Sequence, residues 1–260
     1  GYGMRPIGFF DSGIGGLSVL ATAKRLLPNE HFVYYGDNAR APYGSRTPEE
    51  ISAFTIECVG RLARFNMKAL VLACNTATSV AVERLRAMLE IPVISMEPAI
   101  KPAFETRKHG RVAVMATPAT LVQPRFLRLS RRIDPKGEAL LLPCPGLVER
   151  IEKGVFDAPE IVSYLQELFA PYVEESIESV VLGCTHFVLI EAAVRQVCER
   201  LYPGIHIIHG NEGTVRHLAD VLREQDLLND VSCKGDVVFF SSGDADRLER
   251  LFSSILQGER

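Results

Sequence analysis

Short apolar runs alternate with amphipathic stretches along the whole sequence. The apolar runs lack the polar alternation of a strand that faces water on one side, which is typical of strands buried on both faces. They predict strands at 7–10, 32–35, 69–73, 93–95, 112–116, 139–142, 179–182, 205–208 and 237–240.

The amphipathic stretches have the spacing of helices, and the clearest of them covers 48–65. Thr47 is a candidate N-cap, Pro48 suits the first helical position, and Glu50 completes a capping box. Apolar residues then recur at helical spacing from Ile51 onward. Further helices are predicted at 17–27, 79–89, 121–132, 159–176, 189–201, 212–224 and 245–256.

Strands that alternate with helices through short links favour parallel sheets covered by helices. The sequence therefore predicts the α/β fold class. Its 260 residues allow one large domain or two small ones. No glycine-serine linker marks a boundary between two such domains.

Charge and apolar content exclude several kinds of partner. A net charge of −3 leaves no basic excess to neutralise phosphates, so we expect no nucleic-acid partner. No apolar run approaches the roughly 18 residues of a membrane span, so we expect no membrane attachment. No signal-peptide pattern opens the sequence, and we expect a cytoplasmic location.

The six cysteines form no CxxC pair, and none has a histidine at the spacing of metal ligands. We therefore expect no metal site. Free thiols are favoured over disulfides, because the compartment we expect is reducing. No lysine signature for a pyridoxal cofactor and no P-loop is found, which favours chemistry without a cofactor.

Two of the cysteines follow predicted strands in similar surroundings. The segments 70–76 and 180–186 each contain an apolar strand, a small residue, a cysteine and a threonine, and each leads into a helix. Ligands of open α/β sheets bind at the carboxyl ends of strands. The N-terminus of a helix can also lower the pKa of a nearby thiol. We therefore expect functional thiols at Cys74 and Cys184.

Further polar groups occupy similar positions. The segment 11–16 joins a strand to a helix, and its backbone N–H groups suit an anion, with a carboxylate favoured over a pyrophosphate. It misses the dinucleotide fingerprint because Ser18 replaces the last glycine. Tyr43 and Gly44 lie in a loop that serves either as a plain turn or as a ligand contact. His186, close to Cys184, is placed to assist proton transfer.

Four motifs, in order along the chain, resemble those of the glutamate racemases within the aspartate/glutamate racemase family. They lie at 11–16, at 34–37 with 42–44, at 73–77 and at 182–186. The resemblance implies interconversion of L- and D-glutamate without a cofactor, which supplies D-glutamate for bacterial peptidoglycan.

The resemblance also implies an architecture. Two Rossmann-like three-layer α/β domains with mostly parallel sheets are expected to face each other across a cleft. The first domain would comprise 1–97 plus 207–260, and the second 98–206. A homodimer is expected as well.

In such a racemase Cys74 and Cys184 would be the acid and base, with Asp11 assisting Cys74 and His186 assisting Cys184. A glutamate after the Cys-Pro pair would support the histidine, and Glu152 fits that place, with Glu149 as its rival. The substrate contacts implied are Asp11, Ser12, Tyr43, Gly44, Asn75, Thr76, Thr117, Thr120, Thr185 and His186.

Three alternatives remain open at this point. A related racemase acting on aspartate or another acidic amino acid would differ in the depth of the pocket. A hydrolase would use Cys184, His186 and Asp11 with a single nucleophile, but it leaves Cys74 without a role. A binding module without catalysis would use the same polar loops.

Overall fold

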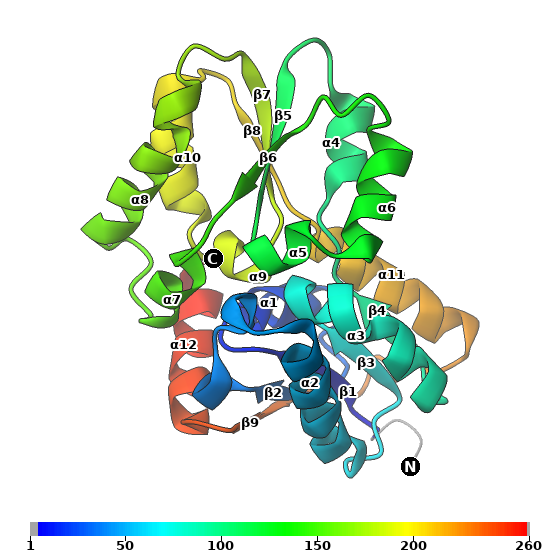
Figure 1. Ribbon diagram of the computed structural model, residues 1–260. Helices are drawn as coiled ribbons and strands as arrows, with labels where there is room; N and C mark the ends of the chain where they lie inside the picture. The colour runs from blue at the N-terminus through cyan, green and yellow to red at the C-terminus, as the bar shows by residue number, and fades with distance from the viewer. Residues whose placement is uncertain (1–4, 259–260) are drawn as a thin grey trace.

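The computed structural model describes residues 5–258 and contains two parallel β-sheets, one above the other in Figure 1. The first sheet has the strand order β4-β3-β1-β2-β9 and the second β6-β5-β7-β8. All neighbouring strands pair in parallel. The strands are β1 (Ile7–Asp11), β2 (Phe32–Gly36), β3 (Ala69–Leu72), β4 (Val93–Ser95), β5 (Arg111–Ala116), β6 (Leu140–Pro143), β7 (Ile177–Leu182), β8 (His206–Ile208) and β9 (Val237–Ser241).

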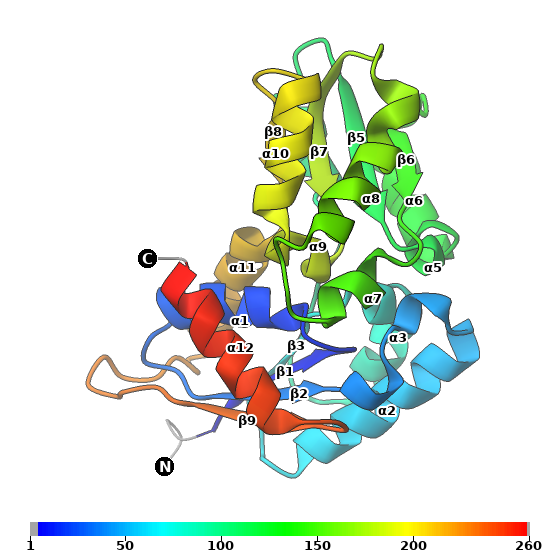
Figure 2. The ribbon, with the colours of Figure 1, turned by 90° about the vertical axis from the view of Figure 1, so that its left-hand side faces the viewer.

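Helices cover both faces of each sheet, which gives two three-layer units (Figures 1 and 2). The helices with the first sheet are α1 (Gly16–Leu26), α2 (Pro48–Ala63), α3 (Asn75–Met88), α11 (Asn211–Glu224) and α12 (Ala245–Gly258). Those with the second are α4 (Ile100–Thr106), α5 (Pro118–Leu121), α6 (Pro124–Ile133), α7 (Leu147–Glu152), α8 (Pro159–Phe169), α9 (Thr185–Leu189) and α10 (Glu191–Leu201).

The predicted α/β fold is confirmed, and each predicted strand is found within two residues of its expected bounds. Burial explains this success most clearly for β1, β2 and β3, which are fully buried along their length. The capping box of α2 is also present, since Thr47 and Glu50 bond reciprocally. None of the helices in residues 5–258 is long and apolar enough to cross a membrane.

Prolines divide two of the predicted helices. The stretch 121–132 was expected to be one helix, but Pro124 begins a new one, because proline lacks an N–H and clashes inside a helix. The helix expected at 159–176 ends at Phe169 and gives way to a turn around Pro171. The short helices α4, α7 and α9 were not predicted, because a helix of five to seven residues has too few turns to show a hydrophobic periodicity.

The chain crosses between the two units twice. It leaves the first sheet after β4 and returns after β8, so that α11, β9 and α12 complete the first unit (Figure 1). The strand β8 pairs with β7 over Ser179–Val181. A domain boundary between 206 and 207 would divide β8, so the second unit extends at least to Ile208.

A buried ion pair holds the returning segment in the first unit. The Lys68 ammonium contacts Glu30 Oε1 at 2.6 Å, and both side chains are almost fully buried. It also donates to the Leu227 carbonyl oxygen (2.5 Å) and to Asn229 Oδ1 (3.0 Å). The Asn229 N–H in turn donates to Glu30 Oε2 at 2.6 Å. The cluster therefore ties the loop after α11 to the N-terminal part of the chain.

Replacing Lys68 with methionine is expected to lower the free energy of unfolding by about 3–5 kcal/mol, because Glu30 would stay buried without a counter-charge. Urea denaturation followed by circular dichroism measures this change. The double variant Lys68→Met, Glu30→Gln should recover most of the loss. A single variant as stable as the wild type would contradict the assigned role of the ion pair.

Candidate active site

The strand ends of the two units meet at their junction. Cys74 follows β3 and precedes α3, and Cys184 follows β7 and precedes α9. Thr185 joins the two halves, because its N–H donates to Asn75 Oδ1 (3.0 Å) and its hydroxyl donates to the Ala73 carbonyl oxygen (2.7 Å). The residues that follow the two predicted thiols are therefore joined by a hydrogen bond.

Cys74 is the N-cap residue of α3 and is 5% exposed. Its sulfur accepts the Ala77 N–H at 3.3 Å, and its thiol donates to Ser12 Oγ at 3.6 Å. The helix begins four residues earlier than predicted, because the thiol takes over the capping function that an oxygen usually supplies.

The expectation that the helix N-terminus lowers the pKa of this thiol is wrong for Cys74. Burial raises the pKa of Cys74, and the negative charge of Asp11 raises it further. The Ala77 N–H and Ser12 oppose this only in part, while Cys184 lies close enough for its thiolate charge to add to the increase. A Cys74 thiolate is therefore a strong base.

Cys184 is 6% exposed and belongs to a chain of three polar side chains. Its sulfur lies 3.8 Å from His186 Nδ1, and His186 Nε2 lies 2.5 Å from Glu152 Oε2. Burial alone would lower the pKa of His186, but its bonds to Cys184 and Glu152 and the charge of Asp11 raise it well above its usual value. The imidazole is therefore held as a cation beside the thiol.

Glu152 is the glutamate that reaches His186, whereas Glu149 is exposed on α7. Burial would raise the pKa of Glu152, but the bond and charge of His186 and the Ile14 N–H lower it. That N–H lies 2.8 Å from Glu152 Oε2. Glu152 therefore links the second unit to the glycine-rich loop of the first.

The glycine-rich loop is shaped by close contacts with the second unit. A Cβ atom on Gly13 would lie 2.6 Å from Glu152 Cδ. A Cβ atom on Gly15 would lie 2.7 Å from His186 Cγ. One backbone N–H of this loop is already paired within the protein, because the Ile14 N–H donates to Glu152 Oε2.

Asp11 lies at the end of β1 and is completely buried. Its Oδ2 accepts the Gly13 N–H at 2.9 Å, whereas its Oδ1 has no hydrogen-bond partner within residues 5–258. Burial raises the pKa of Asp11, and the nearby His186 cation opposes the increase. His186 pairs with Glu152 and not with Asp11, so the third member of the proposed hydrolase triad is not in place.

Three threonine hydroxyls, one of them two residues after Cys74, form a buried cluster. Thr76 Oγ1 lies 2.8 Å from Thr117 Oγ1, which lies 3.0 Å from Thr120 Oγ1. Gly44 approaches this cluster, since a Cβ atom there would be 3.4 Å from Thr117 Cβ. These four predicted contact residues therefore form one wall across the two units.

The side chain of Tyr43 is held by Asp37. Its hydroxyl donates to Asp37 Oδ2 at 2.5 Å, and its ring packs between Phe10 and Phe54. Asp37 is also held by Arg40 at 2.9 Å. The side chain of Tyr43 therefore anchors the turn that carries Gly44, and its hydroxyl points at Asp37.

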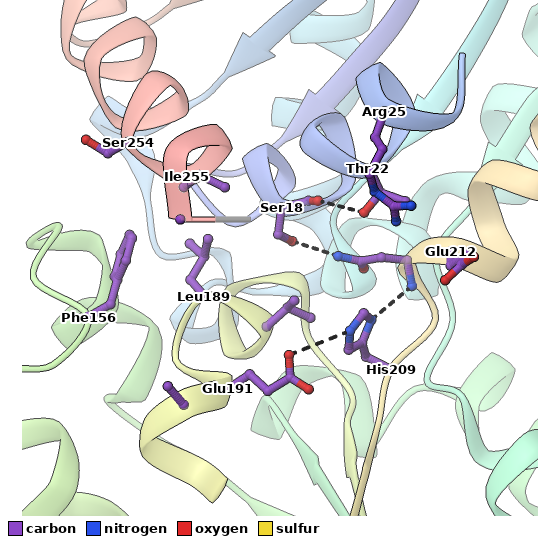
Figure 3. A pocket seen from close by; sticks show the side chains of 14 residues that line it. Ser18, Thr22, Arg25, Phe156, Leu189, Glu191, His209, Glu212, Ser254 and Ile255 are labelled. Carbon is purple, nitrogen blue, oxygen red and sulfur yellow. Dashed lines mark hydrogen bonds and ion pairs between the residues drawn. The ribbon is translucent and has the colours of Figure 1, made fainter. Parts of the chain in front are cut away.

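One cavity is lined by none of the predicted site residues. It measures about 570 Å³ and lies between α1, α11 and α12 and the helices α9 and α10 (Figure 3). Ser18, His209 and Asn211 contribute polar atoms to its wall. Within residues 5–258, no three His, Cys, Asp or Glu side chains are arranged so that they could hold a metal ion.

The structure brings in two groups that the sequence analysis did not assign to the site. The Ile14 N–H is a backbone group and leaves no signal in a sequence. Ser18 was visible only as the residue that breaks the dinucleotide fingerprint, and its hydroxyl contacts Thr185.

The Glu152→Gln variant is expected to shift the basic limb of the pH profile of kcat/KM to lower pH. Glu152 raises the pKa of His186, so its removal lets the imidazole lose its proton at a lower pH. We also expect kcat to fall by about 10²-fold. Glu149→Gln, an exposed residue of the same helix, is the matched control. Identical profiles for Glu152→Gln and the control would contradict the assignment.

Comparison with known proteins places the chain in a family. The model of the Asp/Glu/Hydantoin racemase family matches residues 17–218. A glutamate racemase of Clostridium perfringens is 42% identical over 97% of this chain and 96% of its own length.

Two solved structures are also similar over almost their whole length. A Francisella tularensis glutamate racemase in complex with D-glutamate has a TM-score of 0.82 and 28% identity, with 98% of this chain and 94% of that one covered. An Escherichia coli glutamate racemase in complex with L-glutamate and the activator UDP-MurNAc-ala has a TM-score of 0.83 and 29% identity, with 98% and 95% covered. The protein therefore belongs to the Asp/Glu/Hydantoin racemase family and is an isomerase.

Proposed function

We propose that the protein interconverts L- and D-glutamate without a cofactor, with Cys74 and Cys184 as the two acid–base groups. The observation that carries the proposal is the pair of buried thiols, each at the start of a helix after a strand end, joined through Asn75 and Thr185. The names of similar proteins support glutamate as the substrate.

Inversion at a carbon that carries one hydrogen needs a base on one face and an acid on the other. A thiolate on one side removes the α-proton, which leaves a planar carbanion with its charge spread onto the carboxylate. A thiol on the opposite side then donates a proton and completes the inversion. The two sulfurs exchange roles when the opposite enantiomer binds.

The α-proton of an amino acid is far less acidic than a thiol in water, so the site has to change both partners. The burial that raises the pKa of Cys74 makes its thiolate a stronger base. On the other side, His186 Nδ1 lies 3.8 Å from the Cys184 sulfur, where it could exchange a proton with the thiol. The two thiols thus have different polar surroundings.

Polar groups near Cys74 suit the charged ends of an amino acid. Asp11 Oδ1 is buried without a hydrogen-bond partner in the described part of the chain, and it would accept a hydrogen bond from the substrate ammonium group. The hydroxyls of Thr76, Thr117 and Thr120 would donate to a carboxylate, and so would the Gly44 N–H. Ser12, Asn75 and Thr185 complete the substrate contacts that we propose.

We further propose a cytoplasmic homodimer that supplies D-glutamate for peptidoglycan. The family resemblance supports this part of the proposal, and the similar proteins compared above are bacterial.

Incubation of the protein with L-glutamate, L-aspartate and L-glutamine in separate reactions tests the substrate. Loss of optical activity should be fastest with glutamate, by about 100-fold or more, because a pocket of fixed depth rejects a shorter or uncharged chain. Faster racemisation of aspartate would favour the alternative that the protein is an aspartate racemase. Binding without any change in optical activity would indicate a binding module and overturn the proposal.

A further inference from the structure

Ser18 lies where the dinucleotide fingerprint has its last glycine. In that fingerprint the glycine allows a helix to pack closely against its strand. Here the side chain is retained although it is only 4% exposed, on the first turn of α1. A hydroxyl buried at a position that usually excludes a side chain calls for partners.

The partners of this hydroxyl come from three parts of the chain. It can donate to the Gly15 carbonyl oxygen at 2.9 Å and to the Thr185 carbonyl oxygen at 3.2 Å. Its oxygen accepts the side-chain N–H of Asn211 at 3.0 Å, a bond drawn in Figure 3. Ser18 thus connects α1, the start of α11 and the residue next to Cys184.

Thr185 is the residue through which Ser18 reaches the two thiols. All three polar groups of Thr185 bond to the first unit, through Asn75, the Ala73 carbonyl oxygen and Ser18. Ala73 and Asn75 flank Cys74, and Thr185 follows Cys184. The position of Thr185 therefore sets how far apart the two sulfurs lie.

We propose that Ser18 is a positioning residue for racemisation, which acts through Thr185 to fix the separation of Cys74 and Cys184. The inference rests on the proposed two-thiol function. It adds to that function a supporting residue, Ser18, at the position of the last fingerprint glycine. Ser18 touches neither sulfur in this arrangement, so its effect is on geometry.

Loss of the Ser18 hydroxyl would remove the buried hydrogen bonds to Asn211 and Thr185. Asn211 is 1% exposed, and its Oδ1 has no hydrogen-bond partner among the residues that the structure describes, so its side-chain amide would lose a further bond. The Thr185 carbonyl oxygen would lose the contact from α1. Thr185 would keep its bonds to Ala73 and Asn75, so the variant should fold while the two halves shift relative to each other.

The experiment compares kcat and KM for L-glutamate in the wild type and in Ser18→Ala. We expect kcat to fall by about 10- to 100-fold, because a small misplacement of reacting groups costs that much. We expect KM to change by less than about threefold, because the substrate contacts themselves remain. Ser18→Thr, which keeps the hydroxyl, should recover a substantial part of kcat.

Thr22→Val is the matched control. Thr22 lies one turn further along α1, is also buried, and its hydroxyl donates only within the helix, to the Ser18 carbonyl oxygen. This variant should keep the kcat of the wild type. All assays are made at a temperature where melting curves show each variant to be folded.

The outcomes separate the inference from the function on which it rests. A wild type that does not racemise glutamate would overturn the proposed function. An active wild type with an unchanged kcat in Ser18→Ala would overturn the positioning role, even if that variant melted at a lower temperature. An equal fall of kcat in Ser18→Ala and Thr22→Val would also overturn it, since packing of α1 would then explain the effect.

Discussion

Replacement of Cys74 or Cys184 by alanine is expected to lower kcat/KM for glutamate racemisation by about 10⁴-fold in each case. Each variant would keep one of the two groups, but a single thiol can serve only one face of the α-carbon. Removal of a proton without its return to the other face does not invert the centre. Optical rotation of L-glutamate solutions measures the loss.

Cys198→Ala is the matched control for this pair of variants. Cys198 is fully buried in α10, within the hydrophobic core. Its replacement should lower stability but leave kcat/KM close to that of the wild type. Circular dichroism should show the same secondary structure in all three variants. Full activity of either the Cys74 or the Cys184 variant would remove the two-thiol mechanism.

Replacement of Gly13 by alanine is expected to lower kcat by about 10²- to 10³-fold. The added Cβ would lie 2.6 Å from Glu152 Cδ and 2.7 Å from Oε1, so the carboxylate would have to move. Its movement would break the bond to the Ile14 N–H and misplace His186 beside Cys184. A methyl group added in the first unit would thereby impair proton transfer at Cys184 in the second unit.

Gly60→Ala is the control for this variant, because a Cβ atom on Gly60 meets nothing within 4 Å. It should be fully active. The Gly13→Ala, Glu152→Gln double variant should be little worse than either single variant, because both disturb the same carboxylate. Unchanged activity in Gly13→Ala, or additive losses in the double variant, would contradict the assigned contact.

The strand ends were predictable from sequence because buried parallel strands are continuous apolar runs. Cys74 and Cys184 follow such runs directly, so their place in the fold could be predicted from the local pattern. The choice between Glu152 and Glu149 could not be predicted from the local pattern. It depends on α7, a helix of six residues with no periodicity to detect, and on which of its faces turns towards His186.

Two further features of the site, the pKa of Cys74 and the hydrogen bond of Tyr43, could not be predicted from the sequence. The helix N-terminus at Cys74 was visible, but the burial that outweighs it comes from the packing of the two units. Tyr43 was a candidate ligand contact, and only the fold reveals that its hydroxyl donates to Asp37. In both cases the deciding partner is fixed by tertiary contacts rather than by local pattern.

The most direct test of the account follows the α-hydrogen itself. L-glutamate is racemised in deuterium oxide, and the deuterium content of each enantiomer is measured at early times after their separation. With one sulfur on each face, D-glutamate should carry deuterium from its first appearance, while the remaining L-glutamate keeps its hydrogen. D-glutamate that retains the hydrogen of its own precursor would mean that one base serves both faces, and the account would fail.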